Sequence, residues 1–347
     1  MKNVKYGKCV RCGKTYDAVP DLTNCECGGI LDIVYDYDYI KSVLTKEKLA
    51  KRENRSMWRY RELLPVEETT PDTPLRVGWS PLYEEPKLAE LLGIKRLWVK
   101  DDGQNPTASL KDRASAMAVA KAMEAGAKTI ACSSTGNAAI NPYLSEGKKT
   151  VALEIAEQLN WEMPDYLAIS VGDGCTIAGV WKGFKDLYAI GFIDKLPRLI
   201  SAQSLGCYPI NRAIQNNEPW EPMEENTIAD SISVGVPRNA DKALMAIRES
   251  NGIAVNVSDE EILAAQRLLG RTCGVFGEPA GVTGAAALKK ACEQGLIPHD
   301  ATVVSVVTGN GLKDVANAIK SAGEPIHIEP DLDLMVEEFK KRGVTVE

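Results

Sequence analysis

The sequence predicts an α/β protein with a mainly parallel sheet, preceded by a small hairpin that carries paired cysteines. Two observations predict this fold. From about residue 80, short apolar runs alternate with amphipathic stretches, and four cysteines lie close together near the N-terminus. Alternating strands and helices are typical of a parallel sheet that helices cover on both faces. Ligands of such sheets bind beyond the carboxyl ends of the strands, so we expect the chemistry in the loops there.

Composition and charge exclude several classes of protein. The 347 residues are 44% hydrophobic and 26% charged, as expected for a globular chain of two or three domains. A net charge of −7 disfavours nucleic-acid binding, which needs clustered basic side chains. No apolar run reaches the ~18 residues of a membrane span, and the first residues do not resemble a signal peptide. The odd number of cysteines, nine, then indicates reduced thiols and a cytoplasmic protein.

Residues 1–36 predict a zinc-ribbon-like hairpin. Their cysteines form two pairs, each followed by glycine: Cys9, Cys12, Cys25 and Cys27. Each turn can direct two thiolates to one tetrahedral zinc ion, and glycine lets the backbone fold beneath it. The second pair has one intervening residue instead of the usual two, so four free thiols in a metal-free hairpin are the alternative. Histidine ligands are not expected, because the two histidines lie at positions 299 and 327.

The remaining chain divides into a linker and the alternating region. We interpret residues 37–75, with the basic run Lys46–Arg61, as a solvated helix and linker. The expected strands are Leu97–Lys100, Thr129–Cys132, Tyr166–Val171, Leu199–Ala202, Ile253–Val257 and Thr302–Val307. The expected helices are Lys111–Ala125, Glu146–Leu159, Thr176–Ala189, Asp259–Gly270, Val282–Gln294 and Leu312–Ser321.

The first strand-end loop, Asn105–Arg113, has the sequence N-P-T-A-S-L-K-D-R and delivers Lys111 to the start of a helix. The helix dipole and the nearby Arg113 would lower the pKa of the lysine amine, because a second positive charge is unfavourable there. A lysine with a lowered pKa can form a Schiff base. The alternative is an ordinary surface lysine at a helix start.

Three further loops follow predicted strands. Ser133–Asn137 (S-S-T-G-N) offers hydroxyls and amides to a carboxylate, and Val171–Thr176 (V-G-D-G-C-T) offers a glycine turn and a helix N-terminus to a phosphate. The loop that begins at Thr308 (T-G-N-G-L-K-D) adds a hydroxyl that can face a ring nitrogen. A reactive lysine, a phosphate-binding turn and such a hydroxyl are together what pyridoxal 5'-phosphate (PLP) requires.

In this order, N-P-T-A-S-L-K-D-R, S-S-T-G-N, V-G-D-G-C-T-I-A-G, F-G-E-P-A-G and V-T-G-N-G-L-K-D resemble the motifs of threonine synthases. These are fold-type II PLP enzymes, and many members of this branch begin with a cysteine-paired ribbon. The resemblance implies a lyase of amino-acid biosynthesis that converts O-phospho-L-homoserine and water to L-threonine and phosphate. We also expect a homodimer. The alternatives are another PLP lyase or β-replacement enzyme, of the cysteate synthase or dehydratase type, and a catalytically impaired PLP-binding protein.

The resemblance also implies a role for each matched residue. Lys111 would bind PLP covalently and transfer protons. Asn137 would form a hydrogen bond with the ring hydroxyl of PLP, and Thr308 would face the pyridine nitrogen. The cofactor phosphate would be held by Gly172, Asp173, Gly174, Cys175 and Thr176. The substrate carboxylate would be bound by Ser133, Ser134 and Thr135.

The sequence departs from the family pattern at three places. Leu110 stands where phenylalanine usually precedes the lysine. Leu144 stands where some members have an arginine for the substrate phosphate, so that contact must come from elsewhere. The larger departure is that Asn141-Pro142 follows almost directly on Asn137, so at least two βα units of the small domain are missing. Two explanations stay open: the polypeptide has lost this segment, or the polypeptide contains the segment and the sequence omits it.

We therefore expect three parts. These are a ribbon over residues 1–36, a large PLP-binding domain over 37–96 and 141–347, and a small-domain remnant over 97–140.

Overall fold

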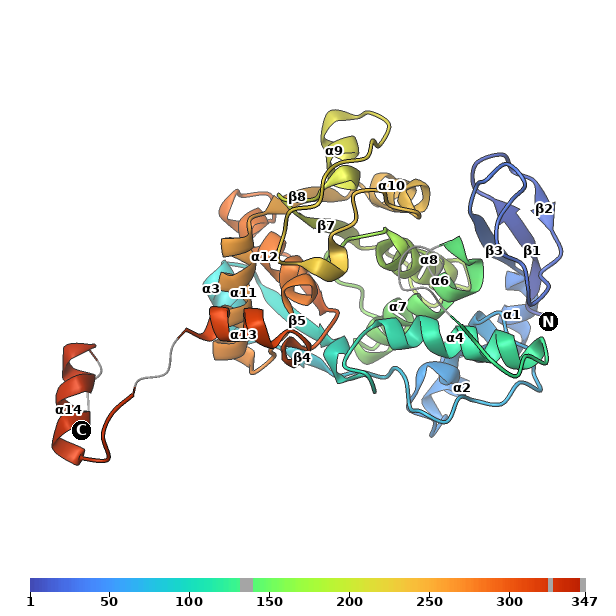
Figure 1. Cartoon of the computed structure of the whole chain (residues 1–347). Coiled ribbons are helices and arrows are strands. Elements are labelled where there is room, and N and C mark those ends of the chain that lie inside the picture. Colours follow the sequence, from blue (N-terminus) through green and yellow to red (C-terminus); the bar gives the residue numbers. More distant parts are fainter. Residues whose placement is uncertain (132–139, 324–326, 344–347) are drawn as a thin grey trace.

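The computed structural model describes residues 1–131, 140–323 and 327–343, and its largest part is a six-stranded sheet between two layers of helices (Figure 1). The strand order is β4-β5-β9-β6-β7-β8; β4 is antiparallel to β5, and the other pairs are parallel. The strands are β4 (Leu82–Glu84), β5 (Arg96–Asp101), β6 (Tyr166–Ser170), β7 (Arg198–Ser204), β8 (Ile253–Val257) and β9 (Thr302–Val307). The predicted parallel sheet is confirmed, together with five of its six expected strands.

Two layers of helices cover the sheet, because successive side chains of a buried strand point to opposite faces. Leu167 and Ile169 of β6 pack with one layer, whereas Ala168 between them packs with the other. The first layer consists of α7 (Thr150–Gln158), α8 (Cys175–Ala189), α9 (Pro209–Asn216) and α10 (Ala240–Glu249). The second layer consists of α3 (Pro86–Leu92), α11 (Asp259–Cys273) and α12 (Pro279–Glu293).

The predicted helix Glu146–Leu159 is two helices, α6 (Pro142–Lys148) and α7, which meet at Lys149. Asn141 caps α6 by accepting hydrogen bonds from the amides of Tyr143 and Leu144, and proline suits the first helical position since its missing N–H is not needed there. Helix α4 (Lys111–Glu124) has the predicted start and lies against α6.

The predicted strand Thr129–Cys132 is wrong over residues 129–131, which form no strand and are exposed; Cys132 lies outside the described residues. Ile130 is 49% exposed although it belongs to an apolar run. A strand needs a neighbouring strand for its backbone hydrogen bonds. The units expected to supply that neighbour are those missing after Asn137, so the run has no sheet to join.

The N-terminal segment is a three-stranded antiparallel sheet in the order β2-β1-β3, which confirms the expected hairpin. Its strands are β1 (Val4–Cys9), β2 (Thr15–Tyr16) and β3 (Leu31–Tyr35). β3 fastens it to the large domain, because Asp32 pairs with Lys182 of α8 at 3.1 Å and with Lys242 of α10 at 2.8 Å. Tyr35 adds a hydrogen bond of 2.7 Å to Glu146 of α6.

The interpretation of residues 37–75 as a solvated linker is wrong for its central part. After α1 (Tyr37–Val43) and α2 (Lys46–Ala50), the 3-10 helix η1 (Met57–Leu63) is buried. Arg59 within it is only 2% exposed and donates to Glu157 of α7 at 2.9 Å. The basic run did not predict this burial. Met57, Trp58, Tyr60 and Leu63 of η1 are buried, and the arginine between them can be buried because it pairs with a carboxylate.

The expected boundary at residue 97 also needs correction, because β5 pairs in parallel with β9 and belongs to the large sheet. The rest of the division into a ribbon, a large domain and a small-domain remnant stays a prediction. At the other end, η4 (Gly311–Lys313) and α13 (Val315–Ala322) replace the expected helix Leu312–Ser321. Helix α14 (Leu332–Lys341) buries none of its residues and stands apart from the sheet (Figure 1). Among the described residues, no helix has the length and apolar character to cross a membrane.

A buried ion cluster joins α4 to the main sheet. The Arg113 guanidinium is fully buried and donates from Nε to Asp102 Oδ2 at 2.7 Å and from Nη2 to Glu154 Oε2 at 2.8 Å. Lys100 Nζ of β5 reaches the same Glu154 oxygen at 2.8 Å. Each charge is thus matched within the cluster, which a buried ion requires.

We expect Arg113→Met to lower the free energy of unfolding by about 3–5 kcal/mol, because it leaves Asp102 and Glu154 buried without their shared cation. The matched control is Arg96→Met, whose half-exposed pair with Glu84 should contribute about 1 kcal/mol or less. Chemical denaturation of both variants measures the difference. Equal losses in the two variants would contradict a structural role for the cluster.

Candidate active site

Two of the four predicted loops are hydrogen-bonded to each other at the carboxyl edge of the sheet. Leu110 N donates to Thr308 O at 2.9 Å, and Asn310 N donates to Ala108 O at 3.0 Å. An isolated antiparallel bridge joins Ser109 to Gly309 between these bonds. The lysine loop after β5 and the loop after β9 therefore form one unit, because their two strands are neighbours in the sheet.

Lys111 is the first residue of α4, and its side chain is exposed at this junction. The surrounding protein partly desolvates the amine and so lowers its pKa, against the opposing attraction of Glu278. Lys313 and Lys148 lower the pKa further through like-charge repulsion. A lysine with a lowered pKa is more often neutral and nucleophilic, as predicted from the sequence.

The source of the lowered pKa differs from the sequence-based expectation. Arg113 was expected to repel the Lys111 charge, but its guanidinium lies in the buried cluster with Asp102 and Glu154. The lysines that act on Lys111 come from η4 and from the end of α6, both distant in sequence. Only the folded chain brings them to α4.

Glu278 is a site residue that the sequence reasoning missed. Its backbone amide donates to Gly309 O at 2.9 Å, and its carboxylate pairs with Lys313 at 3.2 Å. The carboxylate lies so close to Gly309 that a Cβ there would be 2.2 Å from Glu278 Oε1. The motif F-G-E-P-A-G contains this glutamate, so the signal was present but carried no assigned role.

The third loop, Val171–Thr176, forms a tight glycine turn between β6 and the N-terminus of α8. Gly174 has φ +89, and a Cβ on it would lie 2.6 Å from the Ala243 side chain. A Cβ on Gly172 would lie 2.9 Å from Ile232 Cα in η3 (Asp230–Ile232). Only glycine permits this approach, and no side chain caps α8. The first amides of α8 are thus well placed for an anion.

Two side chains of this turn are already used within the protein. Asp173 Oδ1 accepts a hydrogen bond from Arg238 N at 3.0 Å, and Asp173 O accepts one from Asn239 N at 3.1 Å. These bonds hold the backbone at Arg238 and Asn239 against the turn. The Cys175 thiol is buried, which raises its pKa and keeps it neutral. Backbone amides, rather than these side chains, are the groups that suit a phosphate here.

Four predicted site residues, Ser133, Ser134, Thr135 and Asn137, lie outside the described residues. The structure therefore gives no account of the loop expected to bind the substrate carboxylate and the cofactor ring hydroxyl.

The described donor set fits PLP. An amine with a lowered pKa suits an aldehyde, the uncapped N-terminus of α8 suits a phosphate, and the partly exposed Thr308 suits a ring nitrogen. At positions 172 and 174 the turn packs too closely on Ile232 and Ala243 to admit a Cβ, which holds its backbone at the start of α8. These groups follow β5, β6 and β9, three adjacent strands of the sheet.

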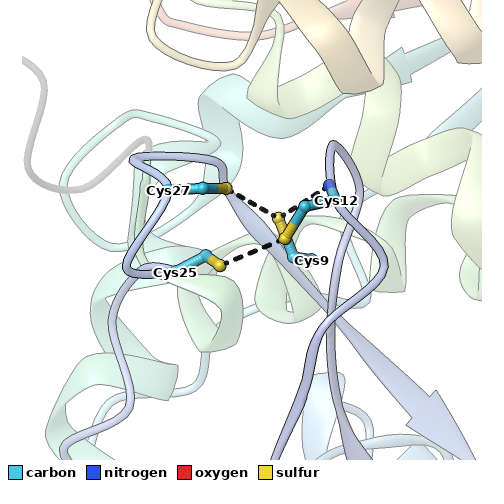
Figure 2. Close-up of side chains that lie close together, drawn as sticks. All are labelled: Cys9, Cys12, Cys25 and Cys27. Carbon is cyan, nitrogen blue, oxygen red and sulfur yellow. Dashed lines mark hydrogen bonds between the residues drawn. The ribbon is translucent and has the colours of Figure 1, made fainter.

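The four N-terminal cysteines form a separate cluster (Figure 2). Their sulfur atoms all lie within 4.8 Å of one another; Cys9 is 3.6 Å from Cys27, and Cys12 is 3.5 Å from Cys25. Four thiolates around one zinc ion lie about 3.8 Å apart, as a Zn–S bond of ~2.3 Å requires. The Tyr16 hydroxyl, 3.0 Å from Cys25 Sγ, lowers the pKa of that thiol and so favours the thiolate that binds metals.

Glycines let the two cysteine turns close around this point. A Cβ on Gly29 would lie 2.7 Å from Cys9 Sγ and 3.2 Å from Cys27 Sγ. Gly13 and Gly28 follow a cysteine of each pair and have φ values of +78 and +75. The predicted geometry of the ribbon is therefore present, with the unusual spacing of the second pair accommodated by two consecutive glycines.

Comparisons with known proteins also indicate PLP as the cofactor. The pattern of the family described as pyridoxal-phosphate dependent enzyme matches residues 74–141 and 139–309. Threonine synthase of Methanocaldococcus jannaschii is 38% identical over 398 residues, covering 94% of this chain and 98% of that protein. Threonine synthase of Methanosarcina acetivorans is 37% identical, covering 95% of this chain and 97% of that protein.

A solved structure of threonine deaminase isoform 2 from Solanum lycopersicum has the same fold. It matches with a TM-score of 0.55 at 17% identity, over 70% of this chain and 86% of that one.

The same comparisons indicate that this chain lacks a segment that its relatives have. The alignment with the Methanocaldococcus jannaschii protein extends over 398 positions, whereas 94% of this 347-residue chain is about 326 residues, so about 72 positions face a gap. The two matched family segments meet at residues 139–141. The family pattern therefore breaks at the point where only three residues of the sequence separate Asn137 from Asn141-Pro142, which is where the sequence indicated a missing segment.

Proposed function

Because this chain belongs to the threonine synthases, a family of PLP-dependent lyases, we propose that its joined loops convert O-phospho-L-homoserine and water to L-threonine and phosphate. The observation that carries the proposal is the junction of the Lys111 and Thr308 loops, which two backbone hydrogen bonds hold together. PLP, when bound, supplies the electron sink for the elimination.

Lys111 is the proposed cofactor-binding and proton-transferring residue. Its amine, with its lowered pKa, would take the Cα proton of the substrate, pass it on, and then take a Cβ proton as the phosphate leaves from Cγ. Protons then return to Cγ and Cα as water adds its hydroxyl to Cβ and releases its own proton. Thr308 offers a hydroxyl to the ring nitrogen, which, unlike a carboxylate, does not force that nitrogen to be protonated. Glu278 holds Lys313 beside the Lys111 amine and so balances the positive charge there.

The cofactor phosphate is proposed to bind at the N-terminus of α8, through the turn Gly172, Asp173, Gly174, Cys175 and Thr176. The hydrogen bond that the Asp173 carboxylate accepts from Arg238 N and the burial of the Cys175 thiol support a backbone role for both residues. We retain Ser133, Ser134 and Thr135 for the substrate carboxylate and Asn137 for the ring hydroxyl, on the support of the motif alone. A homodimer also remains a proposal, on the support of the family resemblance alone. A cytoplasmic location remains a proposal too, supported by the cysteines of the described residues, none of which forms a disulfide.

Release of phosphate and formation of threonine from O-phospho-L-homoserine, measured with the PLP-loaded protein, test this function. We expect both products in equal amounts. Release of ammonia from serine or threonine without phosphate turnover would instead favour a dehydratase, and use of sulfite would favour a cysteate synthase.

We further propose that Cys9, Cys12, Cys25 and Cys27 bind one structural zinc ion. The cluster of four thiols within 4.8 Å supports this, as does its anchoring to α8 and α10 through Asp32 rather than to the Lys111 loop. A structural zinc ion stabilises the segment that it closes, because the free energy of metal binding adds to that of folding.

Metal analysis should find about one zinc ion per chain, and Cys25→Ser should abolish it. We expect the thermal unfolding midpoint of Cys25→Ser to fall, while PLP binding stays unchanged. Cys292→Ser is the matched control, since Cys292 lies outside the cluster and should keep both zinc and stability. Protein purified without chelators that holds no zinc would refute the site.

A further inference from the structure

Lys148, the last residue of α6, carries a positive charge that no protein group neutralises in the part of the chain that the structure describes. Its side chain is half-buried, and its amine makes no hydrogen bond, ion pair or ring contact with residues 1–131, 140–323 or 327–343. The next residue is a contrast, because Lys149 pairs with Glu146 and Asp186, each at 2.6 Å. A partly desolvated ammonium without a partner is unfavourable unless a ligand supplies the opposite charge.

The packing of α6 places this charge beside the proposed site. A Cβ on Gly147 would lie 2.2 Å from Arg113 O, two residues after Lys111 in α4. A Cβ on Gly179 would lie 3.2 Å from Lys148 Cβ, four residues after Cys175 in α8. The end of α6 therefore packs against the N-terminal parts of α4 and α8, the two helices that carry proposed cofactor-binding residues.

The electrostatic influence of Lys148 reaches both ends of the site. Its charge is among the causes that lower the pKa of the Lys111 amine, and it also opposes the rise in the pKa of the Cys175 thiol. The other charged groups that act on Lys111 are Glu278, Lys313 and Asp230. Of the two lysines near Lys111, Lys313 is already paired with Glu278. Lys148 is left to meet an anionic ligand.

We propose that Lys148 binds a phosphate monoester in the active site. The proposal rests on the proposed function, in which the substrate and the cofactor are both phosphate monoesters with about two negative charges. Leu144, where the family resemblance led us to expect an arginine, lies four residues earlier on α6 and so on the same helix face. Lys148 restores a cation to that face, one turn nearer the end of the helix.

Paired ligands with and without phosphate test this role. The affinity of the apoprotein for PLP and for pyridoxal is measured by visible absorption in the unmodified protein and in Lys148→Gln. The PLP-loaded forms are then titrated with O-phospho-L-homoserine and with L-homoserine. If Lys148 binds phosphate, Lys148→Gln weakens the binding of one phosphorylated ligand by about 10- to 100-fold and leaves its phosphate-free partner unchanged. Which ligand weakens identifies the phosphate that Lys148 binds.

Two further variants separate this role from a structural one. Lys148→Arg should keep most of the phosphate affinity, and Lys87→Gln, which alters an exposed lysine on α3, should change nothing. If Lys148 only stabilised the C-terminus of α6, Lys148→Gln would lower the unfolding temperature and spare the phosphorylated ligands. That result, or equal loss for both members of a pair, would overturn the proposal. Phosphate-dependent binding without threonine formation would instead contradict the proposed function alone.

Discussion

A polypeptide of this sequence should bind PLP and turn yellow, yet form threonine at least about 100-fold more slowly than its relative from Methanocaldococcus jannaschii. The Lys111 loop, the glycine turn and Thr308 are present, so most of the groups proposed to bind the cofactor remain. About 72 alignment positions have no counterpart in this chain, and the family pattern breaks just after the loop Ser133–Asn137. Looseness of ~1 Å in a group that positions the substrate costs about 100-fold in rate.

The missing segment also bears on how the substrate is enclosed. In fold-type II enzymes the small domain closes over the substrate, excludes water and fixes the reacting bond. The exposed run at residues 129–131 shows one direct consequence, because apolar side chains that should enter a sheet have none to join. We therefore expect the loss mainly in kcat, with PLP affinity close to that of the relative.

Intact-mass measurement precedes the rate comparison. A mass well above 37.7 kDa would show that the polypeptide contains the segment. If the mass is 37.7 kDa, inserting the relative's segment after Asn137 should restore turnover. Turnover equal to that of the relative without the insertion would contradict the role assigned to the small domain.

Lys111→Ala should abolish threonine formation, with a fall of about 10⁴-fold from the most active form available. In the proposed mechanism, the variant loses both the covalent bond to PLP and the base that moves the substrate protons. It should still bind PLP weakly and without a covalent bond, since the turn at Gly172–Thr176 does not depend on the amine. Steady-state kinetics and visible absorption together measure these effects.

Lys313→Ala is the control for Lys111→Ala. It removes a neighbouring lysine that pairs with Glu278 but leaves the Lys111 amine in place. We expect it to keep covalently bound PLP and measurable turnover. Equal inactivation of the two variants would mean that the site depends on general positive charge rather than on one nucleophilic amine.

The sequence was most informative where local rules and the fold agree. β6 and β9 were predictable because each is a short, almost wholly apolar run, which is what a strand buried on both faces requires. The junction of the Lys111 and Thr308 loops follows from strand adjacency, but that adjacency was visible only through the family motifs. The cysteine cluster was predictable from spacing, since both turns are local.

Other features could not be predicted because they depend on contacts between distant segments. Arg113 and Lys111 are two residues apart, yet one is fully buried in an ion cluster with Asp102 and Glu154 while the other faces the site. Glu278 reaches the site only because its backbone amide is hydrogen-bonded to the carbonyl oxygen of Gly309. The apolar run at Thr129 has the local pattern of a strand. It forms none, because the strands with which it would pair are missing.

The most direct test of the central claim, that these loops form a PLP site around Lys111, is borohydride reduction of the PLP-loaded protein followed by peptide mapping. The site predicts a single labelled peptide that contains Lys111, and no such label in Lys111→Ala. The two other lysines near this amine, Lys148 and Lys313, provide the internal comparison. Label on either of them in the unmodified protein, or no covalent label at all, would contradict the claim.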